Sequence, residues 1–509
     1  MAPPHLGAGI DTSQISPQEI RLDVEDAQDT SNSQEAPYSV FTKPEKRWII
    51  FLVAMAGFFS PLSANIYFPA INYLARDLSV SLELINLTIT AYLICQGIVP
   101  ALVGDAADML GRRPVYIAAF VVYLAANLGL ALQDSYAALL VLRILQSSGS
   151  SGTIALAISV VADLAPPHER GKYVGAALSG PNMAPSLGPV LGGVLAEKAS
   201  WRWIFWFLSM LSGFCLALII ICLPETARKL VGNGSVRPKC LNRSVVSYMS
   251  KPKASQNLSE HLDPPFRCPN PLSCLRIVFH KDTALVLVAN AVFYMNYSCM
   301  QASLSPLLMD IYGLNALEVG LTYLPYGIAC GIASFLVGKV MDHDYKVTAA
   351  AVGFTIDKTK GDDLARFPIE KARLRSIWYF VSISTACTIG YGWTLQAKAH
   401  LAAPLILQFI CGLTVTGTFN ICNTLIVDLH PDRPATASAS VSIVRCSVAA
   451  IGVSILQFIL ENLGPGWTFT IFGALGAATA PMLWVEWDKG KRWRTERLEK
   501  KTTVQHEKS

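Results

Sequence analysis

Charged side chains are scarce in this chain of 509 residues: they account for 15% of it, while hydrophobic residues account for 52%. Soluble domains carry about 25% charged residues, so the composition argues against a soluble protein. A helix that crosses a membrane needs about 20 largely apolar residues, and the sequence contains twelve such segments. They are 48–74, 85–103, 115–132, 136–161, 173–196, 203–223, 284–308, 319–341, 377–395, 402–427, 435–460 and 467–484. We therefore predict an all-α membrane protein with twelve transmembrane helices.

Patterns that would indicate catalysis are also missing. The sequence has no P-loop for ATP, no grouping of nucleophile, base and acid, and no histidine within a predicted span. The 12 cysteines are scattered, and the spacing of Cys268 and Cys274 matches no zinc pattern. We expect no enzyme, no ATP-driven pump, no cofactor and no metal. The net charge of +5 is explained by loops that face anionic lipid, so it does not indicate nucleic-acid binding.

Lysine and arginine are nearly absent from one side of this topology. Of the 41 such residues, 35 fall in the tails and loops of one side, four fall on the other side, and Arg143 and Arg445 lie within spans. Positive residues stay in the cytoplasm, so both termini are predicted to be cytoplasmic. We expect the cell membrane, with the vacuolar membrane as an alternative.

A long polar connection on the cytoplasmic side divides the spans into two groups of six, which indicates an internal repeat. The first residues are polar without an apolar run, a composition typical of disorder. The predicted organisation is a disordered cytoplasmic N-terminal tail at 1–46, a six-helix bundle at 47–223, a cytoplasmic linker at 224–283, a second six-helix bundle at 284–487 and a cytoplasmic C-terminal tail at 488–509.

The short loop after the second span reads GDAADMLGRRP. Gly104 and Gly111 allow close approach and a tight turn, Asp108 can accept hydrogen bonds, and Arg112 and Arg113 hold the cytoplasmic rim. In place and spacing the loop resembles the G-x-x-x-D-x-x-G-R-R/K motif of the major facilitator superfamily. The resemblance implies two six-helix bundles whose cytoplasmic gate this loop latches. The alternative is a turn that merely carries positive charge.

The fourth span carries polar residues on one helical face, among them Arg143 and Gln146. A charge within a span costs at least about 2.5 kcal/mol and normally faces the bundle interior. Arg143, Gln146 and Gly149 resemble the superfamily motif R-x-x-Q-x-x-G, which implicates the arginine in proton coupling. The alternative is an arginine that extends outward to the membrane surface.

The fifth span contains three prolines and four glycines within SGPNMAPSLGPVLGG. Small residues let helix backbones approach closely in a membrane, and neighbouring helices can satisfy the freed carbonyls. Six of these positions resemble the G-P-x-x-x-x-x-G-P-x-x-G-G motif of the superfamily's antiporters: Gly180, Pro181, Gly188, Pro189, Gly192 and Gly193. An ordinary glycine-rich packing helix is the alternative. The resemblance, strongest to the twelve-span drug:proton antiporters with fungal members, covers roughly residues 45–490.

Polar and aromatic stripes mark candidate cavity residues, because the superfamily binds its cargo at the midplane between the halves. Aromatic rings combined with amides suit a bulky, mostly apolar ligand with few polar handles, although such stripes are also made by helix packing. No carboxylate lies deep in any span, so the proton carrier is not identified. The candidates are Tyr67, Asn290, Tyr294, Tyr297, Gln301, Asn420 and Arg445.

The resemblance implies a secondary active transporter that works by alternating access, as a monomer. We expect export of drugs, toxins or fungal secondary metabolites in exchange for protons. One alternative is a nutrient or polyamine transporter of the same fold, working as a symporter or facilitator. Another is a sensor that does not transport, although the linker is short and polar for a signalling domain.

Overall fold

The computed structural model describes residues 39–165, 167–234, 236, 243, 277–353, 367–430 and 434–506. Within these residues every regular element is a helix, and none is a strand. The all-α fold class predicted from the sequence is therefore confirmed. Most of the predicted N-terminal tail, most of the linker and the end of the C-terminal tail lie outside the described residues.

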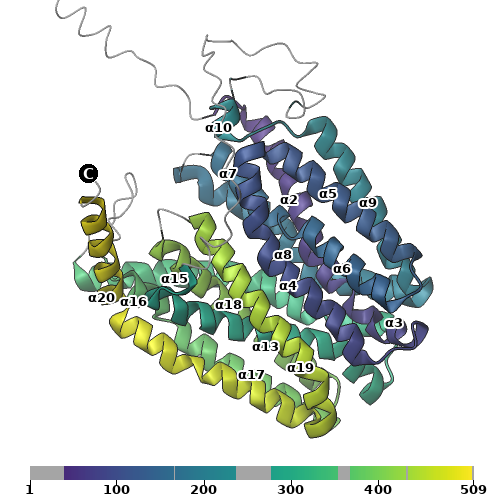
Figure 1. Ribbon diagram of the computed structural model, residues 1–509. Coiled ribbons are helices and arrows are strands. Elements are labelled where there is room, and N and C mark those ends of the chain that lie inside the picture. Colours follow the sequence, from purple (N-terminus) through teal and green to yellow (C-terminus); the bar gives the residue numbers. More distant parts are fainter. Residues whose placement is uncertain are drawn as a thin grey trace, which may run out of the picture.

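The first half of the chain forms one group of helices, drawn purple to teal in Figure 1. Helix α2 packs along α8, α5 packs against α6 and α9, and α4 packs against α6. The elements are α2 (Lys43–Asn65), the 3-10 helix η2 (Phe68–Ala70), α3 (Ile71–Asp77), α4 (Leu82–Leu110), α5 (Arg112–Leu132), α6 (Tyr136–Ser150), α7 (Thr153–Leu164), α8 (Pro167–Lys198), α9 (Trp201–Cys222) and α10 (Arg228–Val231).

The second half forms a second group, drawn green to yellow. Helices α13 and α17 both pack against α19, and α18 packs against α15 and α17. The elements are α13 (Lys281–Tyr312), α14 (Ala316–Thr322), α15 (Leu324–Val352), α16 (Ile369–Leu374), α17 (Ile377–Gln396), α18 (Ala402–Leu429), α19 (Pro434–Ala477) and α20 (Thr479–His506).

Nine helical stretches in the described part of the chain are long and apolar enough to cross a membrane. They make this a multi-pass membrane protein. Helices α8 and α17 coincide with predicted spans 173–196 and 377–395 but are not among the nine. The last stretch, Thr436–Glu499, contains two predicted spans, and Gly464 interrupts its helix with a φ of 74°. The count of twelve membrane helices stays a prediction.

The helix ends define two faces of the molecule. We call one the linker face; there α4 ends at Leu110 and α13 begins at Lys281. We call the other the short-loop face; there α8 ends at Lys198 and α14 begins at Ala316. One hydrophobic cluster contains residues of both halves, and its members from the first half come from the short-loop part of their helices. A second cluster belongs to the first half alone. The two halves therefore share a core toward the short-loop face.

Candidate functional site

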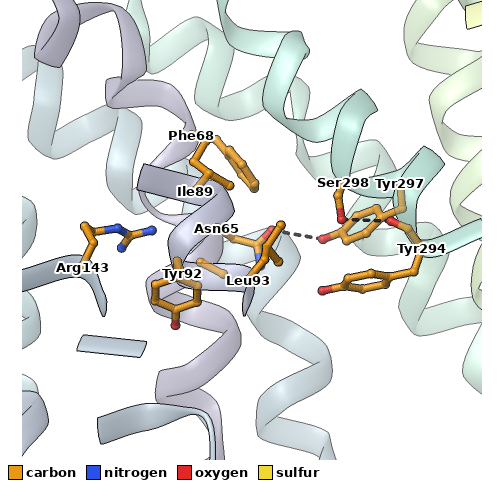
Figure 2. A pocket seen from close by; sticks show the side chains of 10 residues that line it. Asn65, Phe68, Ile89, Tyr92, Leu93, Arg143, Tyr294, Tyr297 and Ser298 are labelled. Carbon is orange, nitrogen blue, oxygen red and sulfur yellow. Dashed lines mark hydrogen bonds between the residues drawn. The ribbon is translucent and has the colours of Figure 1, made fainter. Parts of the chain in front are cut away.

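A pocket lies between the two halves, near the middle of the helices (Figure 2). A hydrogen bond crosses it from the Tyr297 hydroxyl to Asn65 Oδ1, 3.2 Å away. Most of the lining is aromatic or aliphatic, with a few polar groups, as expected for a site that binds a small organic molecule. The lining residues are Ala64, Asn65, Phe68, Ile89, Tyr92, Leu93, Arg143, Tyr294, Tyr297 and Ser298.

Arg143 enters this pocket from α6 and is 1% exposed. Its guanidinium lies between two tyrosine rings, 4.2 Å from the ring centre of Tyr67 and 4.4 Å from that of Tyr92. Nη1 donates hydrogen bonds to Gln146 Oε1 at 2.5 Å and to the Ser63 carbonyl at 3.4 Å. The side chain points into the bundle (Figure 2), so it does not extend outward to the membrane surface.

Gln146 is held in turn by Asn127 of α5, whose Oδ1 accepts a hydrogen bond from Gln146 Nε2 at 2.7 Å. The arginine, the glutamine and the asparagine therefore form a buried polar chain across α5 and α6. Such a chain fixes the direction in which the Arg143 guanidinium points. An arginine does not release its proton in proteins, so Arg143 itself is not a proton carrier.

Arg445 of α19 packs against aromatic side chains of the second half. Its guanidinium carbon is 4.4 Å from the ring centre of Tyr294 and 5.3 Å from that of Phe419. Nη2 is 3.9 Å from Cys446 Sγ, and Nε is buried without a hydrogen-bond partner. In the described ranges neither Arg143 nor Arg445 forms an ion pair with a carboxylate.

The structure brings only some of the other predicted cavity residues to the pocket. Tyr294 and Tyr297 line it, whereas Arg445 and Tyr67 do not. The Tyr67 ring packs against the Arg143 guanidinium, and its hydroxyl lies 3.0 Å from Thr88 Oγ1. Asn290 and Gln301 are fully buried, and their amides have no hydrogen-bond partner among the described residues. Neither of them lines the pocket, and neither does the half-buried Asn420.

Sequence reasoning missed Tyr92, Phe68 and Asn65, which contribute much of the pocket wall from the first half. Phe68 directly follows the predicted cavity residue Tyr67, so widening that prediction by one residue would have found it, whereas Asn65 is two residues away from Tyr67. Tyr92 shares a helical face of α4 with Thr88 and Gln96, four residues to either side, so this spacing was a signal that the sequence reasoning did not use.

The predicted gate motif lies at the linker face. Arg112 pairs with Asp108 through Nη1 at 2.6 Å and with Asp163 through Nε at 3.0 Å. Gly111 takes a φ of 104°, which only glycine adopts readily. A Cβ at Gly111 would lie 2.5 Å from Glu225 Oε2. The predicted close approach at Gly104 is absent from this conformation, since nothing lies within 4 Å of a Cβ built there.

Glu225 completes this corner of the first half. It accepts hydrogen bonds from the backbone N–H of Arg112 at 2.8 Å and of Arg113 at 3.2 Å. A carboxylate at this place satisfies N–H groups that the helix start leaves unpaired and is favoured by the helix dipole. The Arg113 side chain donates through Nη2 to the Ile220 carbonyl at 2.7 Å. The gate motif and Glu225 therefore join the end of α4, the start of α5 and the end of α9.

The glycines of the predicted antiporter motif are the places where α8 touches other backbones. A Cβ at Gly180 would lie 2.7 Å from the Ala54 carbonyl oxygen, and one at Gly188 would lie 3.0 Å from Asn65 Cβ. Gly192 meets the Ile66 carbonyl of the same half, whereas Gly193 meets the Ala316 carbonyl of the other half. Pro181 and Pro189 lie inside α8, which continues through both. The motif packs α8 onto α2 and, at its end, onto α14.

A buried charged cluster lies at the linker face of the second half. Arg494 Nε is 3.0 Å from Glu370 Oε1, and Arg497 Nη1 is 2.9 Å from Asp282 Oδ2. Glu486 is 0% exposed, and neither of its oxygens has a hydrogen-bond partner among the described residues. Burial raises the pKa of Glu370, an effect that the Arg494 guanidinium opposes. The sequence had assigned both arginines to a tail, but α20 carries them into the fold.

The comparisons with known proteins agree with this architecture. The model of the Major Facilitator Superfamily matches residues 53–453. The MFS-type transporter phiD from a fungal species is 42% identical over 475 residues, covering 92% of this chain and 72% of that protein. Citrate exporter 1 of Aspergillus niger is 34% identical over 496 residues, covering 95% of this chain and 92% of the exporter.

Among solved structures, the human organic anion transporter MFSD10 superposes with a TM-score of 0.55 and 17% identity, covering 86% of this chain and 99% of that one. This likeness shows a shared fold. The relatives with higher identity are named as transporters, not as enzymes. The chain is therefore a membrane transporter and belongs to the Major Facilitator Superfamily.

Proposed function

We propose that this chain exports small organic metabolites from the cell by alternating access, in exchange for protons. The observation that carries the proposal is the aromatic pocket enclosed between the two halves and shut off toward the short-loop face. The names of the relatives support it, since one is a citrate exporter and others are MFS-type transporters of fungi. The antiporter motif in α8 supports the exchange with protons.

The contacts between the halves describe one end state of such a cycle. On the short-loop face Glu197 Oε2 accepts a hydrogen bond from the Ala316 backbone N–H at 3.2 Å, and Asn72 Nδ2 lies 3.0 Å from Met309 Sδ. The linker face carries the gate motif of the first half and the charged cluster of the second. With both termini in the cytoplasm of a cell-membrane protein, cargo would enter the pocket from the linker face and leave at the short-loop face.

Within this proposal Arg143 and Gln146 are positioning residues for the exchange. Since Arg143 keeps its proton, another group carries the exchanged proton, and we propose a carboxylate. No carboxylate lines the pocket. The remaining candidates are the cargo's own acid group and the carboxylates at the linker face, of which Glu486 has no partner among the described residues. We propose a monomer as the working unit.

Export and its coupling are tested in cells with and without this protein. A panel of chemically varied inhibitors and secreted metabolites should identify compounds whose intracellular level falls on expression. Transport of such a compound into everted membrane vesicles should then follow a pH gradient. A rise of intracellular compound would favour the uptake alternative, and transport that survives a protonophore would exclude obligatory proton exchange. The polyamine alternative is disfavoured, because the pocket wall already carries the positive charge of Arg143 and no carboxylate.

A further inference from the structure

We infer that the cargo is an organic anion, a carboxylate carried on an aromatic or apolar body, which this pocket binds between Arg143 and Arg445. The inference rests on the proposed function and names its class of substrate. It comes from the balance of charge around the pocket, from the hydrogen-bond donors that remain free there and from the aromatic character of the wall.

The charge around the pocket is positive and uncompensated. Arg143 lines it, and the guanidinium carbon of Arg445 lies 4.4 Å from the ring centre of the lining residue Tyr294. No carboxylate lines the pocket, and the described residues offer neither guanidinium an ion-pair partner. A buried charge is costly unless it is paired, and the attraction to tyrosine and phenylalanine rings offsets only part of that cost. An anion bound in the pocket would supply the missing partner.

Several arginines elsewhere in the described part of the molecule have carboxylate partners there, unlike the two arginines at the pocket. Arg112 at the linker face contacts two carboxylates, and so does Arg202 at the short-loop face. Arg494 pairs with a glutamate. The chain therefore provides acids for these arginines outside the pocket and provides none for the two arginines at the pocket.

The two pocket arginines differ in what they can offer a ligand. Arg143 is clamped between Tyr67 and Tyr92, and its Nη1 already donates to two oxygens. The hydrogen bond described for Arg445 goes to a thiol sulfur, a weak acceptor, whereas Nε has no hydrogen-bond partner in either arginine among the described residues. A guanidinium has five N–H donors in a planar fork that matches a carboxylate. Arg445 does not line the pocket itself, but it lies against the lining residue Tyr294. Within this inference a carboxylate next to Tyr294 pairs with Arg445, and Arg143 adds positive potential from the pocket wall.

The remaining wall selects the body of the cargo. Phe68 and Tyr92 face the pocket from the first half, and Tyr294 and Tyr297 face it from the second (Figure 2). Flat rings on both sides suit an aromatic or extended apolar group. Tyr297 and Ser298 bring hydroxyl groups to the wall, and the rest of it is mostly apolar. The chemistry of the wall therefore suits a molecule with one acidic end and little other polarity.

The first test measures charge selectivity in proteoliposomes that contain the full chain. The probes are 1-naphthoate, the neutral 1-naphthamide and cationic 1-naphthylmethylammonium, which share one ring system. We expect naphthoate to be transported at least tenfold faster than the other two. Arg445→Gln should lower that rate at least tenfold, and Arg445→Lys should restore part of it. Preference for the amide or the ammonium compound would overturn the inference while leaving export itself intact.

The second test does not depend on having chosen a transported compound. Ser298 lines the pocket, and Ser298→Cys places a thiol there with little change in shape. The measured quantity is the rate of modification by a negatively charged methanethiosulfonate divided by the rate for a positively charged one. We expect this ratio to be at least tenfold greater for the pocket thiol than for a free thiol in solution. The unsubstituted chain gives the background from native cysteines. Arg445→Gln should reduce the ratio toward that of the free thiol.

A rate ratio no greater than that of the free thiol would overturn the inference. Failure of the anionic reagent to react would also overturn it, because a site for an organic anion must admit a small anion. If the ratio and its dependence on Arg445 are found but no compound of the cell panel is exported, the proposed export function fails and the anion site stands. The two failures are thereby distinguished.

Discussion

The contact between α8 and α14 on the short-loop face provides the sharpest test of how the halves close. Gly193 and Gly320 face each other there, with Gly193 Cα 3.3 Å from a Cβ built on Gly320. The same Cβ would lie 2.6 Å from the Pro189 carbonyl oxygen. This oxygen belongs to the backbone of α8, so it cannot turn away as a flexible side chain would. Gly320→Ala therefore has to push the two halves apart.

The size of the effect follows from that distance. Ordinary contact begins at 3.4 Å, so the helices must separate by about 0.8 Å to accept the methyl group. Overpacking of this kind costs about 1–3 kcal/mol. Since about 1.4 kcal/mol is a factor of ten, the arrangement closed on the short-loop face should lose ~5-fold to ~150-fold in population relative to the arrangement open there.

The assay is the rate at which a membrane-impermeant maleimide labels a cysteine at position 72. Asn72 contacts Met309 across the two halves, so Asn72→Cys becomes accessible when they part. Gly331→Ala is the matched control: nothing lies within 4 Å of its Cβ, and it has the same gain in helix propensity, about 1 kcal/mol. Equal labelling rates in the Gly320→Ala and Gly331→Ala backgrounds would refute the idea that this contact closes the short-loop face.

Two further predictions concern the linker face. Glu225→Ala should lower the melting temperature of the purified chain, because two hydrogen bonds at the start of α5, each worth about 0.5–1.5 kcal/mol, are lost. Glu461→Ala at an exposed site of α19 should not lower it, and equal shifts would contradict the capping role. Arg494→Ala should lower the free energy of unfolding by about 3–5 kcal/mol, because Glu370 stays buried without its partner. Arg492→Ala breaks an exposed pair and should cost at most about 1 kcal/mol, so chemical denaturation that finds the two variants alike would disprove the buried pair.

Local patterns were enough to predict most of the architecture. Apolar runs of membrane length located the helices, and the glycines and arginines of GDAADMLGRRP located a tight corner at their ends. Arg143 was expected to face the bundle interior because a charge in lipid is costly, and the structure confirms that it does. Each of these expectations depends on residues that are neighbours along the chain or share one helical face.

Contacts between distant segments could not be predicted in this way. The cluster of the second half joins Asp282, Glu370 and Arg494 from three separate elements, and charge counting placed the arginine in a tail. The partner of Gly193 is Gly320, in the other half of the chain, and nothing in the motif around Gly193 indicates it. Asn290 and Gln301 were expected in the cavity because they share a face with Tyr294, yet both are fully buried and neither lines the pocket.

The kinds of contact inside and between the halves favour rigid halves that separate easily. The ion pairs described above join residues of one half: Arg112 to Asp163 in the first, for example, and Arg497 to Asp282 in the second. The described hydrogen bonds between the halves are few, such as those from Tyr297 to Asn65 and from the Ala316 N–H to Glu197. No ion pair described here would have to break when the short-loop face opens, so cargo binding at Arg445 could shift the balance between the two arrangements with a modest free energy.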